Sequence, residues 1–266
     1  MGVVNVTPDS FSDGGVFIDP RRAAAYAARL VDEGVAIVDV GGESTRPGAS
    51  PTDAVVELDR VVPVIERLAG LAVPLSIDTS KAAVAARALA LGAAMVNDVT
   101  ALRGDAAMVD VVGESGAYLV LMHMRGDPRT MQDDPTYDDV VSDVRAFLDE
   151  RVDFAVSQGI SEERIYVDPG IGFGKTVEQN LELIARLDEL VSLGRPVVVG
   201  ASRKSFLGRV LGDGSATKGP LAPALAVATV AYGNGATVIR AHDVREHVQA
   251  LAAAAALEDA RTLELS

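Results

Sequence analysis

Cysteine and tryptophan are absent from this sequence of 266 residues, and aromatic residues are scarce. The lack of cysteine excludes disulfides, a thiolate nucleophile and a cysteine-ligated metal. Hydrophobic residues make up 48% of the chain and aromatic residues only 4%, so the core must be built mainly from alanine, valine, leucine and isoleucine. Side chains of this kind favour helices packed closely against a sheet.

Positive charge is also in short supply. The 24 lysine and arginine residues face 38 acidic residues, which gives a formal net charge of -14. Because lysine and arginine supply most of the non-specific affinity for phosphate groups, we expect neither a nucleic acid nor an anionic membrane as a partner. An anionic substrate must therefore meet a local cluster of cations.

Long apolar runs are missing as well, since none approaches the roughly 20 residues of a membrane span. The stretch from Met1 to Pro8 lacks the positive region and the apolar length of a signal peptide, so the cytoplasm is the default expectation. An alanine-rich stretch at 250–257 is preceded by polar residues on one helical face. We expect it to be the last docked helix, with His247 facing solvent.

Eight short β-rich runs alternate with longer helical stretches, which is typical of parallel β/α construction. The length is close to the roughly 250 residues of an eight-stranded β/α barrel. We therefore predict a (β/α)8 TIM barrel, a single domain over residues 1–266, in preference to an open doubly wound sheet. The predicted strands are Val3–Val6, Ala36–Val40, Leu75–Asp78, Met95–Val99, Tyr118–Met122, Ile165–Asp168, Val197–Gly200 and Thr237–Ala241.

Helix boundaries are marked between these runs. Thr176 and Gln179 form the pattern of a capping box, which predicts a helix that starts at about Val177. Apolar residues at helical spacing within 52–70 predict another helix, and we expect Pro63 to kink or restart it.

Polar residues stand at or just beyond the end of nearly every predicted strand. In a parallel barrel these ends form one rim, so residues far apart in sequence are expected to line one polar pocket. The strand-end residues are Asn5, Asp39, Asp78, Asn97, His123, Asp168, Ser202, Lys204, Arg240 and His242.

Each strand-end residue also has a purely structural interpretation. Asp78 and Asp168 are placed to cap the turn or helix that follows, and Asn97 belongs to an Asn-Asp pair typical of turns. We interpret the isolated His123 as a hydrogen-bonded structural residue. The glycine-rich run 170–176 ends like a phosphate-binding loop, but Pro169 stands where that pattern requires glycine, so we reject a nucleotide site.

Two long segments resemble the loop signatures of dihydropteroate synthases: 5–15, with the sequence NVTPDSFSDGG, and 39–48, with the sequence DVGGESTRPG. Shorter matches follow in family order at 76–79, 96–98, 168–175, 202–205 and 240–243. The resemblance covers nearly the whole chain. It implies a barrel enzyme of folate biosynthesis that joins a pterin methyl diphosphate to 4-aminobenzoate and releases pyrophosphate.

The resemblance also implies roles for individual residues. The pterin would be bound by Asp78, Asn97, Asp168 and Lys204, through matching donors and acceptors. Arg240 would stack on the pterin face, and Met122 and Phe173 would supply apolar walls. Pyrophosphate would lie near Asn5, Thr45, Arg46, Arg240 and His242, at the start of the last helix.

The metal and the second substrate follow from the same resemblance. Asn5 resembles the contact to Mg²⁺, which keeps its waters and relies on substrate phosphates. Phe11, Pro47 and Ser205 match the aminobenzoate pocket, over which the first two loops close. The implied mechanism is dissociative, and the catalytic residues are Asp13, Arg46, Asp78, Asp168 and Lys204. The resemblance further implies a homodimer formed through barrel helices.

Three alternatives remain open at this point. A pterin-binding barrel that transfers a methyl group from a folate to a corrinoid protein would share Asp78, Asn97 and Asp168. A Schiff-base aldolase would use Lys204 as its nucleophile. A degenerate relative would bind pterin without turnover.

Overall fold

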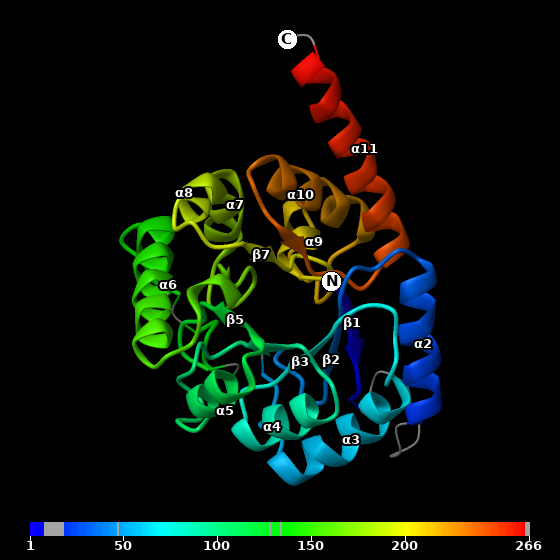
Figure 1. Ribbon diagram of the computed structural model, residues 1–266. Helices are drawn as coiled ribbons and strands as arrows, with labels where there is room; N and C mark the ends of the chain where they lie inside the picture. The colour runs from blue at the N-terminus through cyan, green and yellow to red at the C-terminus, as the bar shows by residue number, and fades with distance from the viewer. Residues whose placement is uncertain (8–18, 47, 128, 134, 264–266) are drawn as a thin grey trace.

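The computed structural model describes residues 1–7, 19–46, 48–127, 129–133 and 135–263. Parallel strands occupy the centre and helices form a ring around them (Figure 1). The strands are β1 (Gly2–Asn5), β2 (Val38–Gly41), β3 (Leu75–Asp78), β4 (Met95–Asp98), β5 (Tyr118–Met122), β6 (Ile165–Asp168), β7 (Val198–Val199) and β8 (Val238–Ile239). The helices are α2 (Pro20–Asp32), α3 (Ala54–Arg67), α4 (Ala82–Ala90), α5 (Met108–Ser115), α6 (Val140–Ser157), the 3-10 turn η1 (Glu162–Arg164), α7 (Val177–Ala185), α8 (Leu187–Val191), α9 (Phe206–Val210), α10 (Leu221–Gly233) and α11 (Val244–Leu263).

The strands close into a barrel, as predicted. Strands β1 to β6 pair in sequence order, and β7 pairs with β8. Parallel bridges from Val167 to Val197 and from Gly2 to Ala241 join the two groups at both edges. Where β1 meets the segment after β8, the N–H of Val3 donates to the carbonyl of Ala241 over 3.0 Å. Every strand end on the carboxyl side therefore meets at one mouth.

The last two strands are shorter than the predicted runs 197–200 and 237–241. The carbonyl of Val197 accepts from both Thr237 N (2.9 Å) and Val238 N (3.0 Å). One acceptor that serves two consecutive donors breaks the regular ladder, so only two residues of each strand remain in regular pairing.

The helix predictions have mixed outcomes. The capping box is confirmed: Gln179 N donates to Thr176 Oγ1 over 3.2 Å, Thr176 N donates to Gln179 Oε1 over 2.8 Å, and α7 begins at Val177. Helix α3 runs through Pro63 without restarting. Proline removes only one backbone hydrogen-bond donor from the helix, and Val61 and Val64 on either side of it are both buried in the core.

The prediction for His247 is wrong. Its side chain is buried, and Nδ1 lies 2.7 Å from the carbonyl oxygen of Asp243. The residue lies in the first turn of α11, next to the body of the barrel, whereas the far end of that helix projects away from it (Figure 1). Within the described residues, no helix has the length and apolarity that a membrane crossing requires.

Alternation along the strands separates the interior of the barrel from its helix-covered outside. Residues such as Val40, Val96 and Val167 pack in the main core under the helices. Their neighbours point inward, where Met95, Val120 and Val198 form a buried cluster with Met1, Ile37, Tyr166 and Val238 packed against it. Because side chains repeat with a period of two, the inward residues one step further along the strands lie above this apolar layer. Those positions carry the strand-end residues of the candidate site.

Candidate active site

The strand-end layer is organised around one arginine. Arg240, which follows β8, donates from Nε to Asp39 Oδ2 and from Nη2 to Asp78 Oδ2, both over 2.7 Å. Asn97 Nδ2 donates to the same Asp39 oxygen over 3.4 Å. Residues from β2, β3, β4 and the end of β8 thus form one hydrogen-bonded group, although Arg240 is 201 residues from Asp39 in sequence. Two carboxylates share one guanidinium, so the group carries one negative charge in excess when both carboxylates are ionised.

Burial is the main influence on the pKa of Asp78 in this group. Burial, opposed by Arg240 and reinforced by the negative charge of Asp39, raises the pKa of Asp78 to about 7. Burial disfavours the charge on Arg240, but Asp39 and Asp78 more than offset it and raise the Arg240 pKa above its usual value. Asp39 Oδ1 has no hydrogen-bond partner among the residues that the structure describes. This layer therefore presents acceptors that are available to the N–H groups of a bound molecule.

Lys204 and Phe173 form the adjoining wall. The Nζ atom of Lys204 lies 3.8 Å from the centre of the Phe173 ring, a cation-π contact. Phe173 is buried together with Met122 and Met131 in an apolar cluster. Burial, followed by the charge of Arg240, lowers the pKa of Lys204 to about 8. A flat molecule that entered here would meet an apolar surface on one side and hydrogen-bonding groups at its edge.

Asp168 combines a structural contact with a place in this layer. Its Oδ1 accepts from Gly170 N over 2.7 Å, so the expected turn interaction is present. Burial raises its pKa, opposed by that hydrogen bond and by the charges of Arg240 and Lys204. The turn chemistry expected of the Asn-Asp pair is carried by Asp98, which accepts from Thr100 N and Leu102 N.

The glycine-rich run after β6 contains an inward-facing lysine. Lys175 Nζ is buried and donates to the carbonyls of Gly170 (3.1 Å) and Phe173 (2.9 Å), and it lies 2.9 Å from His123 Nδ1. Burial, with the neighbouring Lys175 charge, lowers the pKa of His123 to about 2. Lys175 thus stabilises the conformation of its own loop, and His123 makes the hydrogen bond that its interpretation as a structural residue predicts.

A cavity opens at the start of the last helix. This cavity of about 610 Å³ is lined by Asn5, Arg46 and His242, with Arg203 and Arg245 among the other lining residues. Burial, followed by the charge of Arg240, lowers the pKa of His242 to about 3, so the ring is neutral at physiological pH. Helix α11 begins two residues later and directs its free backbone N–H groups to this end. Four arginines line the cavity together with the acids Glu33, Asp243 and Glu246, so positive charges exceed negative ones by one. In a chain with a large negative charge, this local excess of positive charge is suited to an anionic substrate.

His242 contacts Ser202 through its backbone and its ring. Ser202 Oγ accepts from His242 N over 3.2 Å and lies 3.2 Å from His242 Nδ1. A hydroxyl that accepts from the backbone N–H can also donate its proton to Nδ1. In this arrangement Nε2 carries the ring proton and acts as a hydrogen-bond donor.

The remaining predicted residues lie at the edge of the site or outside the description. Thr45 and Ser205 are half-buried, and Ser205 stands directly before α9. Phe11, Asp13 and Pro47 lie outside the described residues. The sequence marks Asp39 as a strand-end residue, and the resemblance assigns it no role. Its two-residue spacing from the inward-facing Ile37 indicates that its side chain also points inward.

Comparison with known proteins agrees with this geometry. Residues 1–242 match the family described as pterin binding enzyme. Dihydropteroate synthase of Mycobacterium leprae is 48% identical over 256 residues, which cover 94% of this chain and 90% of the relative. Dihydropteroate synthase of Escherichia coli K12 is 43% identical over 252 residues, which cover 94% and 88%.

Solved structures agree as well. Xanthomonas albilineans dihydropteroate synthase with 4-aminobenzoic acid has a TM-score of 0.88 and 45% identity, covering 97% of this chain and 92% of that chain. The enzyme from the same organism in complex with 7,8-dihydropteroate has a TM-score of 0.85 and 42% identity, with the same coverage. The chain therefore belongs to the pterin-binding enzyme family and, within it, to the dihydropteroate synthases.

Proposed function

We propose that this chain condenses (7,8-dihydropterin-6-yl)methyl diphosphate with 4-aminobenzoate to give 7,8-dihydropteroate and pyrophosphate, in tetrahydrofolate biosynthesis. The observation that carries the proposal is the hydrogen-bonded group at the mouth of the barrel, next to Lys204, in which Arg240 donates to Asp39 and Asp78 and Asn97 donates to Asp39. A cationic cavity adjoins this group. The strand-end layer and this cavity match the two parts of the first substrate, a flat heterocycle and a diphosphate.

The pterin ring is proposed to bind in the strand-end layer. Its amino-pyrimidine edge carries donors that match the carboxylates of Asp78 and Asp168, and its ring acceptors match Lys204 and the amide of Asn97. Met122 and Phe173 would contact the ring face. Arg240 would stack on the pterin, which requires it to give up part of its present contact with Asp78.

The diphosphate is proposed to occupy the cavity beside Arg240. Arg46 and the neutral His242 would donate to its oxygens, and Thr45 and the backbone at the start of α11 would add further donors. Donors already aimed at this position stabilise the charge that develops on the leaving group. The carbon–oxygen bond would break with its electron pair remaining on pyrophosphate.

The resulting methylene cation would be stabilised by the carboxylates of Asp78, Asp168 and Asp13. The arylamine nitrogen of 4-aminobenzoate, held by Phe11, Pro47 and Ser205, would then form the carbon–nitrogen bond and release its proton to solvent. The lower pKa of Lys204 is also a property of Schiff-base lysines, but the relatives named above are synthases. No enzyme nucleophile takes part in this dissociative route, in which correct placement supplies most of the rate.

The residues present fit a magnesium ion carried in with the substrate. Among the described residues there is no cluster of three or more acidic or histidine side chains that could form a protein cage for a metal. Asn5 offers a single amide oxygen beside the cationic cavity, and Mg²⁺ commonly combines one or two protein oxygens with waters and substrate phosphates. When bound, Mg²⁺ would neutralise charge on the departing pyrophosphate.

We also propose a homodimer and a cytoplasmic location for the enzyme.

The decisive experiment is an assay of two products. Dihydropteroate and pyrophosphate should form in equal amounts from the pterin diphosphate, 4-aminobenzoate and Mg²⁺, and dihydropteroate should be absent when 4-aminobenzoate is omitted. A pterin-binding protein without turnover would bind the substrate and give neither product. That result would refute the proposal.

A further inference from the structure

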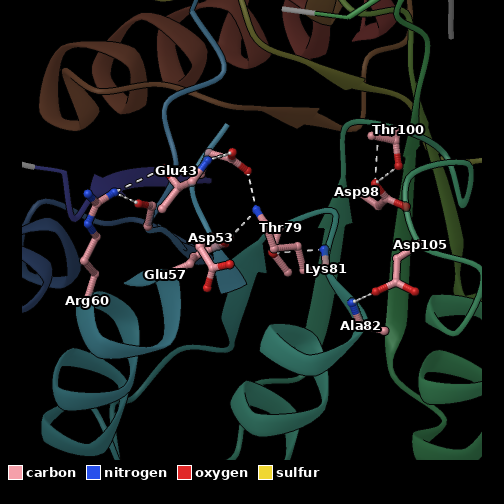
Figure 2. A network of polar contacts seen from close by, with 12 residues as sticks. Glu43, Asp53, Glu57, Arg60, Thr79, Lys81, Ala82, Asp98, Thr100 and Asp105 are labelled. Atoms are coloured by element: carbon pink, nitrogen blue, oxygen red, sulfur yellow. Dashed lines mark hydrogen bonds and ion pairs between the residues drawn. The ribbon is translucent and has the colours of Figure 1, made fainter. Parts of the chain in front are cut away.

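An ion cluster outside the substrate pocket joins the loop after β2 to two helices (Figure 2). Lys81 Nζ lies 2.6 Å from Glu43 Oε2 and 2.7 Å from Glu57 Oε2. Arg60 Nη1 donates to the carbonyl of Gly42 over 2.8 Å. These side chains come from the loop, from α3 and from the residue before α4. We name Glu43, Glu57, Arg60 and Lys81 the loop clamp.

The loop clamp holds both ends of one loop segment. At the end of the segment, Thr52 N donates to Glu43 Oε1 over 2.7 Å, and Thr52 Oγ1 lies 3.4 Å from Arg60 Nη1. At the beginning, a Cβ added to Gly42 would lie 2.7 Å from Val61 Cγ1 and 2.9 Å from Glu57 Cγ. The loop base is therefore seated directly on α3, with no room to shift toward it.

The cluster is more buried than a surface ion pair. The side chain of Glu57 is 0% exposed and that of Lys81 is 21% exposed. Glu57 Oε1 has no hydrogen-bond partner among the described residues. Burial disfavours the charge of Lys81, but Glu43 and Glu57 outweigh it and raise its pKa. Buried ion pairs contribute little net stability, because desolvation offsets their attraction. Stability is thus a weak explanation for such a cluster.

The loop clamp is connected to the substrate pocket on both sides. Lys81 N donates to Thr79 Oγ1 over 3.2 Å, in the turn that directly follows Asp78. The clamped loop carries Thr45 and Arg46, and Arg46 lines the cationic cavity. The positive charge of Arg46 also contributes, after burial and Arg240, to the lowered pKa of Lys204. Arg46 is therefore close enough to the pocket for its position to matter.

We propose that Lys81 is a positioning residue. Through its ion pairs with Glu43 and Glu57, it holds Thr45 and Arg46 over the mouth of the barrel. The loop clamp serves the steps that need the loop, which are diphosphate departure and capture of 4-aminobenzoate. It does not serve recognition of the pterin ring. This inference rests on the proposed function, because it assigns a role within that reaction.

The test compares Lys81→Met with two matched variants. Arg186→Met removes another cation that bonds three carboxylates, those of Asp139, Glu182 and Glu189, in a region that supplies none of the proposed ligands. Lys81→Arg keeps the charge. For each variant, kcat, the KM for 4-aminobenzoate, and the affinity for a pterin that lacks the diphosphate are measured.

Lys81→Met should lower kcat about ten- to a hundredfold, because small misplacements of positioning groups have effects of this size. It should raise the KM for 4-aminobenzoate at least about fivefold and leave pterin affinity within about twofold. Lys81→Arg should recover part of kcat, and Arg186→Met should change none of the three quantities. If Lys81→Met fails to fold, the double variant Glu57→Met with Lys81→Met, which leaves no unpaired buried carboxylate, decides in its place.

Two failures are distinguishable. A wild-type chain that makes no dihydropteroate refutes the proposed function. A wild-type chain that makes it, together with a Lys81→Met variant whose kcat and KM are unchanged, refutes the positioning role alone. Equal losses in Lys81→Met and Arg186→Met would also refute it, because they would indicate a general loss of stability.

Discussion

Replacement of Asp78 by asparagine should make the folded protein more stable at pH 8 and impair it as an enzyme. Asp78 shares Arg240 with Asp39, so the buried group has one negative charge in excess once Asp78 is ionised. Burial, opposed by Arg240, raises the pKa of Asp78 from 3.8 to about 7. Asparagine resembles the protonated carboxyl in shape and removes the excess charge.

The sign of the pH dependence follows from proton binding. Between pH 4 and pH 7 the folded chain holds a proton on Asp78 that the unfolded chain has released, so wild-type stability falls as the pH rises through this window. A non-titrating asparagine does not show that fall. With ~1.4 kcal/mol per pKa unit, the stability of Asp78→Asn relative to wild type should grow by about 2–3 kcal/mol from pH 5 to pH 8.

The assay is thermal unfolding of both proteins at pH 5 and pH 8. In a chain of this size, the expected gain corresponds to a relative rise in Tm of about 5–10 °C. The same variant should lose pterin affinity by about ten- to a hundredfold, since an acceptor is exchanged for a group that also carries donors. An equal Tm difference at both pH values would refute the reasoning about the buried charge.

Asp98 provides the matched control, because it is also a buried acid whose pKa burial raises. Its carboxylate accepts from the N–H groups of Thr100 and Leu102, so an asparagine amide would place a donor against a donor. Asp98→Asn should therefore lower Tm at both pH values.

Further predictions concern three other residues. Lys204→Ala should lower kcat/KM for the pterin diphosphate about ten- to a hundredfold with an unchanged circular dichroism spectrum, because a charge-assisted hydrogen bond is lost; unchanged activity would remove Lys204 from the site. His242→Ala should weaken binding of the diphosphate substrate but not of a pterin without diphosphate. Because the pKa of His242 is lowered to about 3, the pH profiles of wild type and His242→Ala should have the same shape from pH 5 to pH 8, and an inflection lost only in the variant would contradict this. Thr176→Ala should cost about 1 kcal/mol of stability through the lost helix cap, measured by denaturant unfolding, with unchanged kcat.

The barrel was predictable because its signals are local and repeated. Each strand is a short branched run between helix-forming segments, and the capping box at Thr176 needs only four residues to be recognised. The convergence of Asp78 and Lys204 on one mouth followed from parallel topology without knowledge of any distance.

Contacts between distant segments were not predictable in the same way. The sharing of Arg240 by Asp39 and Asp78 depends on barrel closure, which brings β8 against β1. The burial of His247 depends on the angle at which α11 leaves the barrel, and a helical face that carries polar residues does not reveal that angle. The loop clamp was not predictable from the sequence either, because glutamate and lysine on helices are usually solvated.

The most direct test of the account is a crystal structure of this chain with 7,8-dihydropteroate bound. The pterin ring should lie within hydrogen-bond distance of Asp78, Asn97, Asp168 and Lys204, with the aminobenzoate part directed toward Ser205 and out of the mouth. A product molecule bound elsewhere on the chain, or one whose pterin ring makes no contact with Asp78 and Asp168, would contradict it.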